Sequence, residues 1–212
     1  MRKSKWLIVF LLFSFTPIKD GEKWLSDVPG FSTNNYYTAQ VYGEHTWQSF
    51  EQLSDAKQVV NPAQLDYHLL NAAVFFATNR QRDKSRKPLF RFSSLLRNAA
   101  AVHTHQMISK KFFDHVNRKT PALSTMEKRL ALFGITNVAS AENCDYTYID
   151  VDGSTTYWQL ALEIVEDFYK SSGHKKNMLN KTYTHLGCTA EFEPKSDGNY
   201  HYVKVTQNFA AL

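Results

Sequence analysis

Three short segments of the sequence place ionisable side chains directly beside strongly apolar ones. They are the FFDH segment that ends at His115, the AEN segment around Glu142 and the GH pair at His174. Each lies at the edge of a predicted helix or strand, where a side chain can leave the core and face a cleft. Two imidazoles and a carboxylate from separate elements could bind a divalent metal ion or form a hydrogen-bonded polar cluster. The residue types alone do not decide between these two kinds of site.

The same residues suggest two hydrolytic mechanisms. In the first, Zn²⁺ bound by His115 and His174 would activate water, with Glu142 as general base. In the second, the thiol of Cys144 would be the nucleophile and a histidine its base. Two histidines are too few for an ordinary catalytic zinc site, because catalytic zinc usually has three protein ligands. The sequence also lacks Gly-x-Ser-x-Gly and His-Glu-x-x-His motifs, so no such motif supports a hydrolase.

The N-terminus predicts export from the cytoplasm. Arg2, Lys3 and Lys5 precede an almost unbroken apolar run from Trp6 to Phe15. That run is too short to span a membrane as a helix and is typical of a signal peptide, which we place at residues 1–16. An uncleaved N-terminal anchor is the alternative. We therefore expect a secreted or periplasmic protein with no membrane span once the signal peptide is removed.

The predicted export bears on the oxidation state of the two cysteines. Oxidising compartments favour disulfides, and Cys144 and Cys188 allow a single intramolecular pairing. We expect this disulfide, which would contribute about 3 to 4 kcal/mol to the free energy of unfolding in the chain-entropy model. A reactive thiol at Cys144 is the alternative.

Length and charge limit the other function classes. A chain of 212 residues is long enough for one domain with a full core. Its formal charge of +5 rests on 25 Lys and Arg against 20 Asp and Glu, and three of those basic residues belong to the export segment. The mature protein is therefore close to +2, which does not favour a nucleic-acid partner. We expect a monomer.

Apolar periodicity predicts four helices and three strands. The helices are expected at about residues 65–82, 93–107, 123–133 and 156–169, and the strands at 135–142, 186–192 and 200–209. The last two strands form a hairpin. Residues 17–64 have neither period and are expected to be an N-terminal extension of low regularity. Helices that cover an antiparallel sheet define an α+β fold.

The order and spacing of the motifs resemble the CAP superfamily, which comprises the cysteine-rich secretory proteins, antigen 5 and the plant pathogenesis-related 1 proteins. The likeness is greatest to its bacterial secreted branch, the SCP-like extracellular domain. The matching pieces are NRQR, PL, LLRNAAAVHTHQM, KKFFDH, AENC, SSGHKKNML and LGC, in that order. The resemblance covers about residues 65–212, which is the expected domain. It implies a three-layer α-β-α sandwich with a central antiparallel sheet.

The resemblance also implies a cleft that carries two histidines and, in many members, two glutamates. Carried over residue by residue, the histidines fall on His115 and His174 and the first glutamate falls on Glu142. The second glutamate has no match, because the position where it would fall, near Ser171, carries no carboxylate. This weakens any mechanism that needs two carboxylates. The implied ligands are zinc or another divalent cation on the two histidines, and a lipid or sterol.

We therefore expect a secreted binding module for a small apolar ligand, an envelope component or a protein partner, with a metal-assisted or thiol hydrolase as the alternative. We also make predictions for three residues close to these motifs. His103 matches a family histidine and is expected to be a buried structural residue, whereas His105 is expected to face solvent. Gly173 is expected to permit a tight backbone that turns His174 toward His115.

Overall fold

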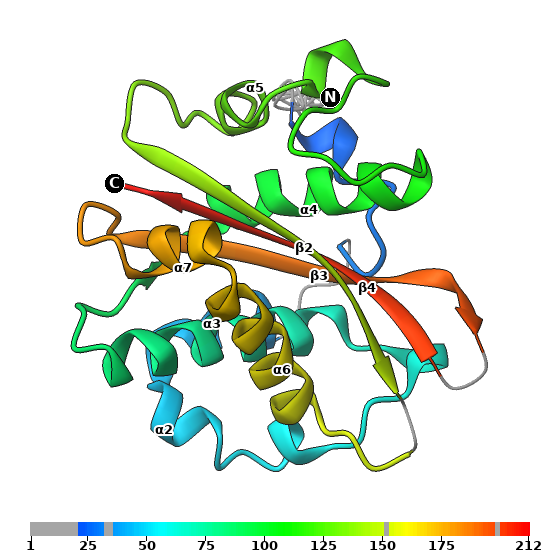
Figure 1. Cartoon of the computed structure of the whole chain (residues 1–212), viewed down its shortest axis with the longest axis vertical. Coiled ribbons are helices and arrows are strands. Elements are labelled where there is room, and N and C mark those ends of the chain that lie inside the picture. The colour runs from blue at the N-terminus through cyan, green and yellow to red at the C-terminus, as the bar shows by residue number, and fades with distance from the viewer. Residues whose placement is uncertain (1–20, 32–35, 151–152, 198–199) are drawn as a thin grey trace, which may run out of the picture.

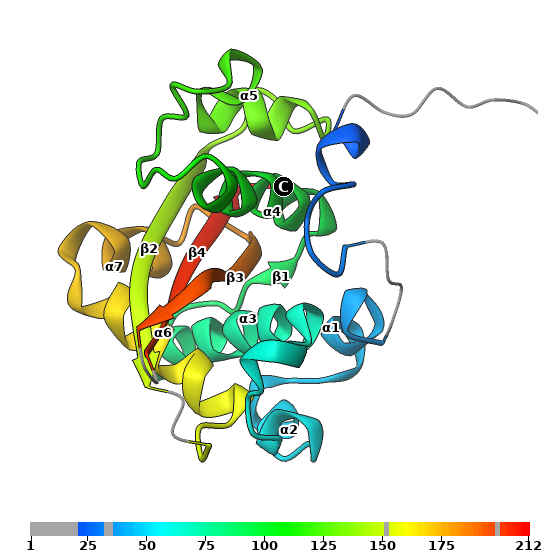
Figure 2. The same cartoon turned by 90° about the vertical axis from the view of Figure 1, so that its right-hand side faces the viewer.

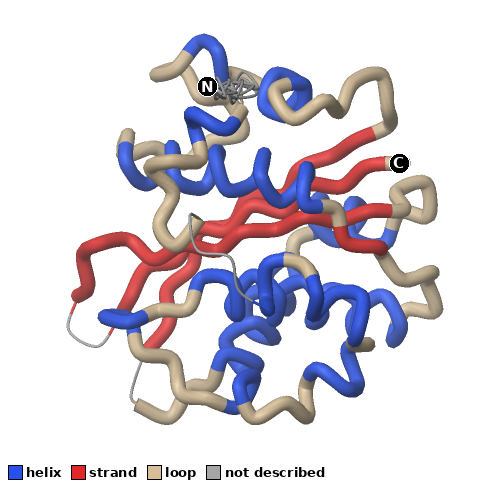
Figure 3. The backbone as a smooth tube through the Cα atoms, turned by 180° about the vertical axis from the view of Figure 1, so that it is seen from behind, coloured by secondary structure: helices blue, strands red, loops and turns tan. Residues whose placement is uncertain are grey.

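The computed structural model describes residues 21–31, 36–150, 153–197 and 200–212. The predicted signal peptide at residues 1–16 lies outside these ranges. A sheet of four strands lies between two groups of helices (Figures 1 and 3). The predicted three-layer α-β-α sandwich of the α+β class is therefore confirmed. None of the helices within the described ranges is long and apolar enough to cross a membrane.

The strand order in the sheet is β1-β3-β4-β2. The strands are β1 (Arg91–Phe92), β2 (Ser140–Asp150), β3 (His185–Asp197) and β4 (Tyr200–Ala210). The predicted hairpin is present as β3 and β4, which are antiparallel, and β4 also pairs antiparallel with β2. Only the short edge strand β1 is parallel to its neighbour. The third strand was expected at residues 135–142, but it begins later and extends to Asp150.

Two layers of helices cover the sheet (Figures 1 and 2). One layer contains α3 (Tyr67–Lys84), α6 (Tyr157–Lys170) and α7 (Ser172–Leu179), and the other contains α4 (Ser94–Ser109) and α5 (Met126–Ala131). The three long helices begin at side-chain N-caps: Asp66 before α3, Ser93 before α4 and Thr156 before α6. Each cap oxygen accepts a hydrogen bond from a free N–H of the first turn.

Helix α7 contains His174, and the sequence did not predict it as a helix. Only Ser171, with φ −77° and ψ 121°, separates α7 from α6. Gly173 lies in the first turn of α7, is not among the glycines with positive φ, and has open space where a Cβ would stand. The prediction that Gly173 is needed for a tight turn is therefore wrong, because the extended backbone at Ser171 makes the turn.

Residues 36–64 are more regular than predicted. They contain η2 (Tyr36–Thr38), α1 (Gln40–Glu44), α2 (Trp47–Phe50), η3 (Asp55–Lys57) and η4 (Pro62–Gln64). Val41, Phe50 and Val60 are buried in the main core together with α3, α6 and the sheet. Leu25 and Val28, which follow the short η1 (Glu22–Trp24), pack on α4 in a second apolar cluster. The described part of the N-terminal extension thus contributes to the core.

The predicted disulfide is wrong, because Cys144 and Cys188 are both free and buried. Strand β4 lies between their strands, so their Cα atoms are about 9.5 Å apart by strand spacing, beyond the roughly 7 Å that a disulfide tolerates. The two thiols also face opposite layers. Cys188 contacts the carbonyl oxygen of Asn71 in α3, whereas Cys144 lies 4.0 Å from Thr206, which hydrogen-bonds to Thr104 in α4.

Candidate functional site

The side chain of Glu142 is the centre of the predicted cluster. It extends from β2 toward α4 and α5, and only 3% of it is exposed. The Nη2 atom of Arg129 in α5 donates to both carboxylate oxygens, at 2.9 and 2.7 Å, and Nδ1 of His115 lies 3.0 Å from Oε1. The structure therefore brings His115 and Glu142 together, as predicted, and adds a buried arginine.

Arg129 is the functional residue that the sequence analysis missed. Its side chain is completely buried, and it also donates to the carbonyl oxygens of Leu123 and His115 at 2.9 and 3.2 Å. It thereby fixes the loop that carries His115 against Glu142. The only signal in the sequence is a basic residue between the apolar positions Met126 and Leu130, which surface arginines also produce.

The pKa of Glu142 is lowered to about 2. Burial by itself raises the pKa of this carboxyl, but the hydrogen bond from His115 and the positive charges of His103 and Arg129 outweigh it. At neutral pH, His103 is uncharged, so His115 and Arg129 are the groups that keep Glu142 ionised. A carboxylate with so low a pKa and two hydrogen-bonded oxygens is a weak proton acceptor.

His115 presents its free nitrogen to solvent. Because the ionised carboxylate of Glu142 can only accept, Nδ1 of His115 must be the donor, and Nε2 is left to carry the lone pair of the neutral ring. The hydrogen bond to Glu142 raises the pKa of His115, and burial opposes that shift. With 53% of its side chain exposed, His115 can contact a ligand.

His174 lies near the pair without touching it. Its ring packs edge-to-face on Phe168 with centroids 5.3 Å apart, and its carbonyl oxygen accepts a hydrogen bond from Asn143 at 3.1 Å. Asn177 in turn donates to Asn143 at 2.9 Å. Burial lowers the pKa of His174, and the charge of His115 lowers it further. Among the described residues, no hydrogen bond or ion pair joins the His174 ring to Glu142 or His115.

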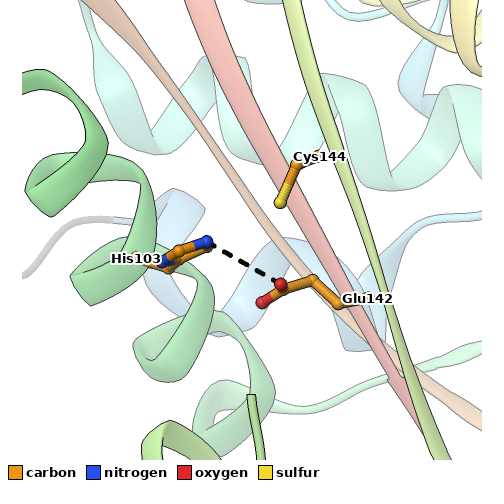
Figure 4. A group of neighbouring side chains, drawn as sticks. All are labelled: His103, Glu142 and Cys144. Carbon is orange, nitrogen blue, oxygen red and sulfur yellow. Dashed lines mark ion pairs between the residues drawn. The ribbon is translucent and has the colours of Figure 1, made fainter. Parts of the chain in front are cut away.

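His103 is buried, as predicted, and lies beside the cluster. Its Nε2 donates to the carbonyl oxygen of Asp114 at 3.1 Å and is 3.7 Å from the carboxylate of Glu142 (Figure 4). Burial lowers the pKa of His103 to about 4. His105 does not face solvent, because it pairs with Glu191 of β3 at 3.0 Å and only 18% of its side chain is exposed. That prediction was wrong.

His103, Glu142 and Cys144 form a buried group whose ligand atoms lie within 4.8 Å of one another (Figure 4). The group does not suit a metal ion, because Arg129 occupies both oxygens of Glu142. Burial also raises the pKa of the Cys144 thiol well above its ordinary value. A protonated, buried thiol is neither a metal ligand nor an activated nucleophile.

A groove of about 560 Å³ lies farther along the same face of the sheet, and none of His115, Glu142 and His174 is among its lining residues. Phe113, two residues before His115, and Tyr146, four residues after Glu142 on the same face of β2, both line it. Its lining consists of Ile108, Ser109, Lys111, Phe112, Phe113, Tyr146, Glu193, Pro194 and Lys204. The volume and the aromatic lining are typical of a small-molecule site.

Comparison with known proteins relates this arrangement to one family. The model of the cysteine-rich secretory protein family, CAP, matches residues 75–209. In Bacillus subtilis (strain 168), the protein YkwD is 28% identical over 110 residues, and the membrane protein YlbC is 31% identical over 107 residues. These matches cover 52% and 50% of this chain but only 38% and 24% of the relatives.

A solved structure has a similar fold. It is the 1.5 Å crystal structure of an extracellular protein containing an SCP domain, from Bacillus anthracis str. Ames. The TM-score is 0.53 at 22% sequence identity, over 73% of this chain and 45% of that one. The described layers therefore have a counterpart that was determined by experiment.

Proposed function

Because the chain belongs to the cysteine-rich secretory protein (CAP) family, we propose that it is an exported binding module for a small apolar ligand and not a hydrolase. The ligand lies in the groove lined by Phe112, Phe113 and Tyr146. The observation that carries the proposal is this groove of about 560 Å³ with three aromatic rings in its lining. A lipid or sterol-like molecule fits that chemistry, whether it is free, belongs to an envelope component or is carried by a protein partner.

The state of the cluster argues against hydrolysis. A general base must accept a proton, and Glu142 is tied to Arg129 with a pKa of about 2. A thiol nucleophile must ionise, and burial holds the pKa of Cys144 well above its ordinary value. Glu142 therefore holds the loop at His115 in place, and Cys144 is a buried, protonated thiol in the core.

Titration with two fluorescent apolar probes tests the proposal: cis-parinaric acid for fatty acids and dehydroergosterol for sterols. We expect at least one to bind, and Phe113→Ala to weaken it about tenfold, because the exposed ring supplies apolar contact that alanine cannot. Leu89→Ala is the matched control, since Leu89 is similarly exposed but outside the groove. If neither probe binds, or if both variants weaken binding equally, the groove is not the ligand site.

A divalent cation is a second candidate ligand, favoured by one observation. A histidine that donates Nδ1–H to a carboxylate is the usual arrangement behind a metal-ligating Nε2, and His115 has this arrangement with Glu142. The residues that would hold the cation are His115 and His174, which fit a site with few protein ligands. Zinc retention after dialysis should fall in His115→Ala and in His174→Ala. Less than about a tenth of an equivalent in the unmodified protein would exclude the site.

A further inference from the structure

We propose that the outer end of the sheet is a binding platform for a neutral oligosaccharide. Four tyrosines form it: Tyr146 and Tyr148 on β2, and Tyr200 and Tyr202 on β4. We call them the tyrosine row. Tyr148, Tyr200 and Tyr202 do not line the groove of the proposed apolar ligand, so this second surface goes beyond the proposed function and can be tested separately.

Strand periodicity places the four rings on one face of the sheet. Side chains alternate along a strand, so Tyr146 and Tyr148 share the face of Glu142. The register places Tyr148 directly opposite Tyr202. Ring centroids are 5.7 Å apart for Tyr146 and Tyr202, 6.5 Å for Tyr148 and Tyr202, and 5.3 Å for Tyr148 and Tyr200. The rings therefore form a continuous row across two strands.

No helix in the described ranges covers this row. The ammonium group of Lys204 donates to the carbonyl oxygens of Met107 and Phe112 at 3.1 and 3.2 Å, so the C-terminal end of α4 lies over Lys204. The positions beyond it on β4 are Tyr202 and Tyr200. Exposed fractions are 43% for Tyr146, 62% for Tyr148 and 45% for Tyr200. Several exposed rings side by side mark an interaction surface.

Among the side chains that the structure describes, the charges around the row are balanced, which indicates a neutral partner. Lys204, whose ammonium group lies over the Tyr146 ring, is paired with Glu193 at 2.8 Å. Asp150 stands opposite Tyr200 at one end, and Lys111 lies in the groove at the other. The remaining polar groups of the row are phenol hydroxyls, which donate and accept hydrogen bonds.

A neutral sugar chain matches this combination. The C–H groups on one face of a sugar ring pack on the electron-rich face of an aromatic ring, and the hydroxyl groups at its rim bond to the phenols. Single-stranded nucleic acids and membranes instead require a basic groove or rim. The row exposes roughly 350 Å², at about 200 Å² for a whole tyrosine, well below the roughly 800 Å² per partner of a stable protein interface.

The test is calorimetric titration of the full chain with cellohexaose, hexa-N-acetylchitohexaose and maltohexaose, each of which is uncharged. We expect at least one hexasaccharide to bind, and the double variant Tyr148→Ala/Tyr202→Ala to weaken it roughly tenfold or more. Tyr148→Phe keeps the ring and should retain most of the affinity. Tyr169→Ala is the matched control, because Tyr169 lies on α6 and belongs to no part of the row.

Three outcomes would overturn this proposal. One is that none of the three hexasaccharides binds to the folded protein, and another is that the double variant binds as well as the unmodified chain. The third concerns vesicles of phosphatidylcholine and phosphatidylglycerol. If the unmodified chain binds these vesicles but no sugar, and the double variant no longer binds the vesicles, the row is a membrane-contact surface. Thermal unfolding of each variant checks that it is folded. Binding of cis-parinaric acid, which reports on the groove, should be unchanged in Tyr148→Ala/Tyr202→Ala.

Discussion

Single residues decide what the Glu142 cluster can do. The carboxylate of Glu142 is held from three directions: by Arg129 of α5, by the loop at His115, and by Asn208 of β4, whose amide nitrogen lies 3.2 Å from Oε2 when it faces the carboxylate. Breaking one side of a buried ion pair is strongly destabilising. The cluster therefore holds the sheet, α5 and the loop at His115 together. Of Glu142, Arg129 and His115, only His115 is exposed enough to contact a ligand.

The buried, uncharged state of His103 predicts a loss of stability in mild acid. Its pKa is about 4 in the folded protein against an ordinary value of about 6.5. Below pH 6.5 the unfolded chain takes up a proton that the folded chain refuses, so the free energy of unfolding falls until about pH 4. The loss should reach about 3 kcal/mol.

Urea denaturation at several pH values measures this effect. His103→Gln keeps a donor for the carbonyl oxygen of Asp114 and does not titrate, so it should remove the part of the loss between pH 6.5 and 4 that His103 causes. The contribution of His174, whose pKa burial also lowers, should remain in both proteins. The further loss below about pH 4.5 should remain, since it comes from protonation of Glu142, whose pKa is about 2 in the folded state. A variant curve that matches the unmodified protein over the upper range would show that His103 is not the group responsible.

At the scale of elements, the backbones of α4 and β3 approach each other closely at Gly187. A Cβ at Gly187 of β3 would lie 2.0 Å from the backbone nitrogen of Arg97 and 2.5 Å from the carbonyl carbon of Leu96. Gly187→Ala must therefore push α4 away from the sheet. We expect a loss of roughly 2 to 4 kcal/mol in the free energy of unfolding, because overpacking against backbone cannot be relieved by a rotamer change.

Gly43 offers the matched control for this substitution. It lies in α1, and a Cβ added there would meet no atom within 4 Å, so Gly43→Ala should change stability by less than about 1 kcal/mol. Chemical denaturation of the two variants compares them directly. Equal, small effects would mean that α4 can move outward freely and that the close approach does not fix its position.

The sequence predicted elements well where local signals agree. The N-cap residues Asp66, Ser93 and Thr156 each precede an apolar stripe, and the long helices α3, α4 and α6 begin beside them. Helix α7 was missed because two serines and a glycine have low helix propensity, and tertiary packing overrides it. The prediction of a disulfide was wrong for another reason. The order of the strands and the face of the sheet on which each cysteine lies are not local properties of the sequence.

The candidate site could be predicted only in part, because its contacts also join residues that are far apart in the sequence. His115 and Glu142 could be paired because a resemblance placed them together, and the structure joins them at 3.0 Å. Arg129 could not be found, since nothing local separates a buried arginine on a short helix from an exposed one. Its role follows from the carbonyl groups of Leu123 and His115 that surround it.

In the whole molecule, the N-terminal segment joins both helix layers at the edge of the sheet that carries β1 (Figure 2). On the α4 side, Arg97 donates to the carbonyl oxygen of Thr38 at 3.0 Å and lies over the ring of Phe31. On the α3 side, Phe50 stacks on Phe76 with centroids 4.5 Å apart. A domain boundary at residue 65, as predicted from the sequence, would cut through this packing.

We therefore expect a chain of residues 65–212 to lose cooperative unfolding, although it contains the whole segment that matches the family model. Removal of residues 1–64 exposes the apolar faces of α3 and α4, which should appear as dye binding and a weakened near-ultraviolet circular dichroism spectrum. In the full chain, Phe50→Ala should cost about 3 to 5 kcal/mol, whereas Gln48→Ala, at an exposed position of the same helix, should cost almost nothing. If residues 65–212 instead unfold cooperatively at the melting temperature of the full chain, the segment is an appendage and the stability of the fold resides in the matched region alone.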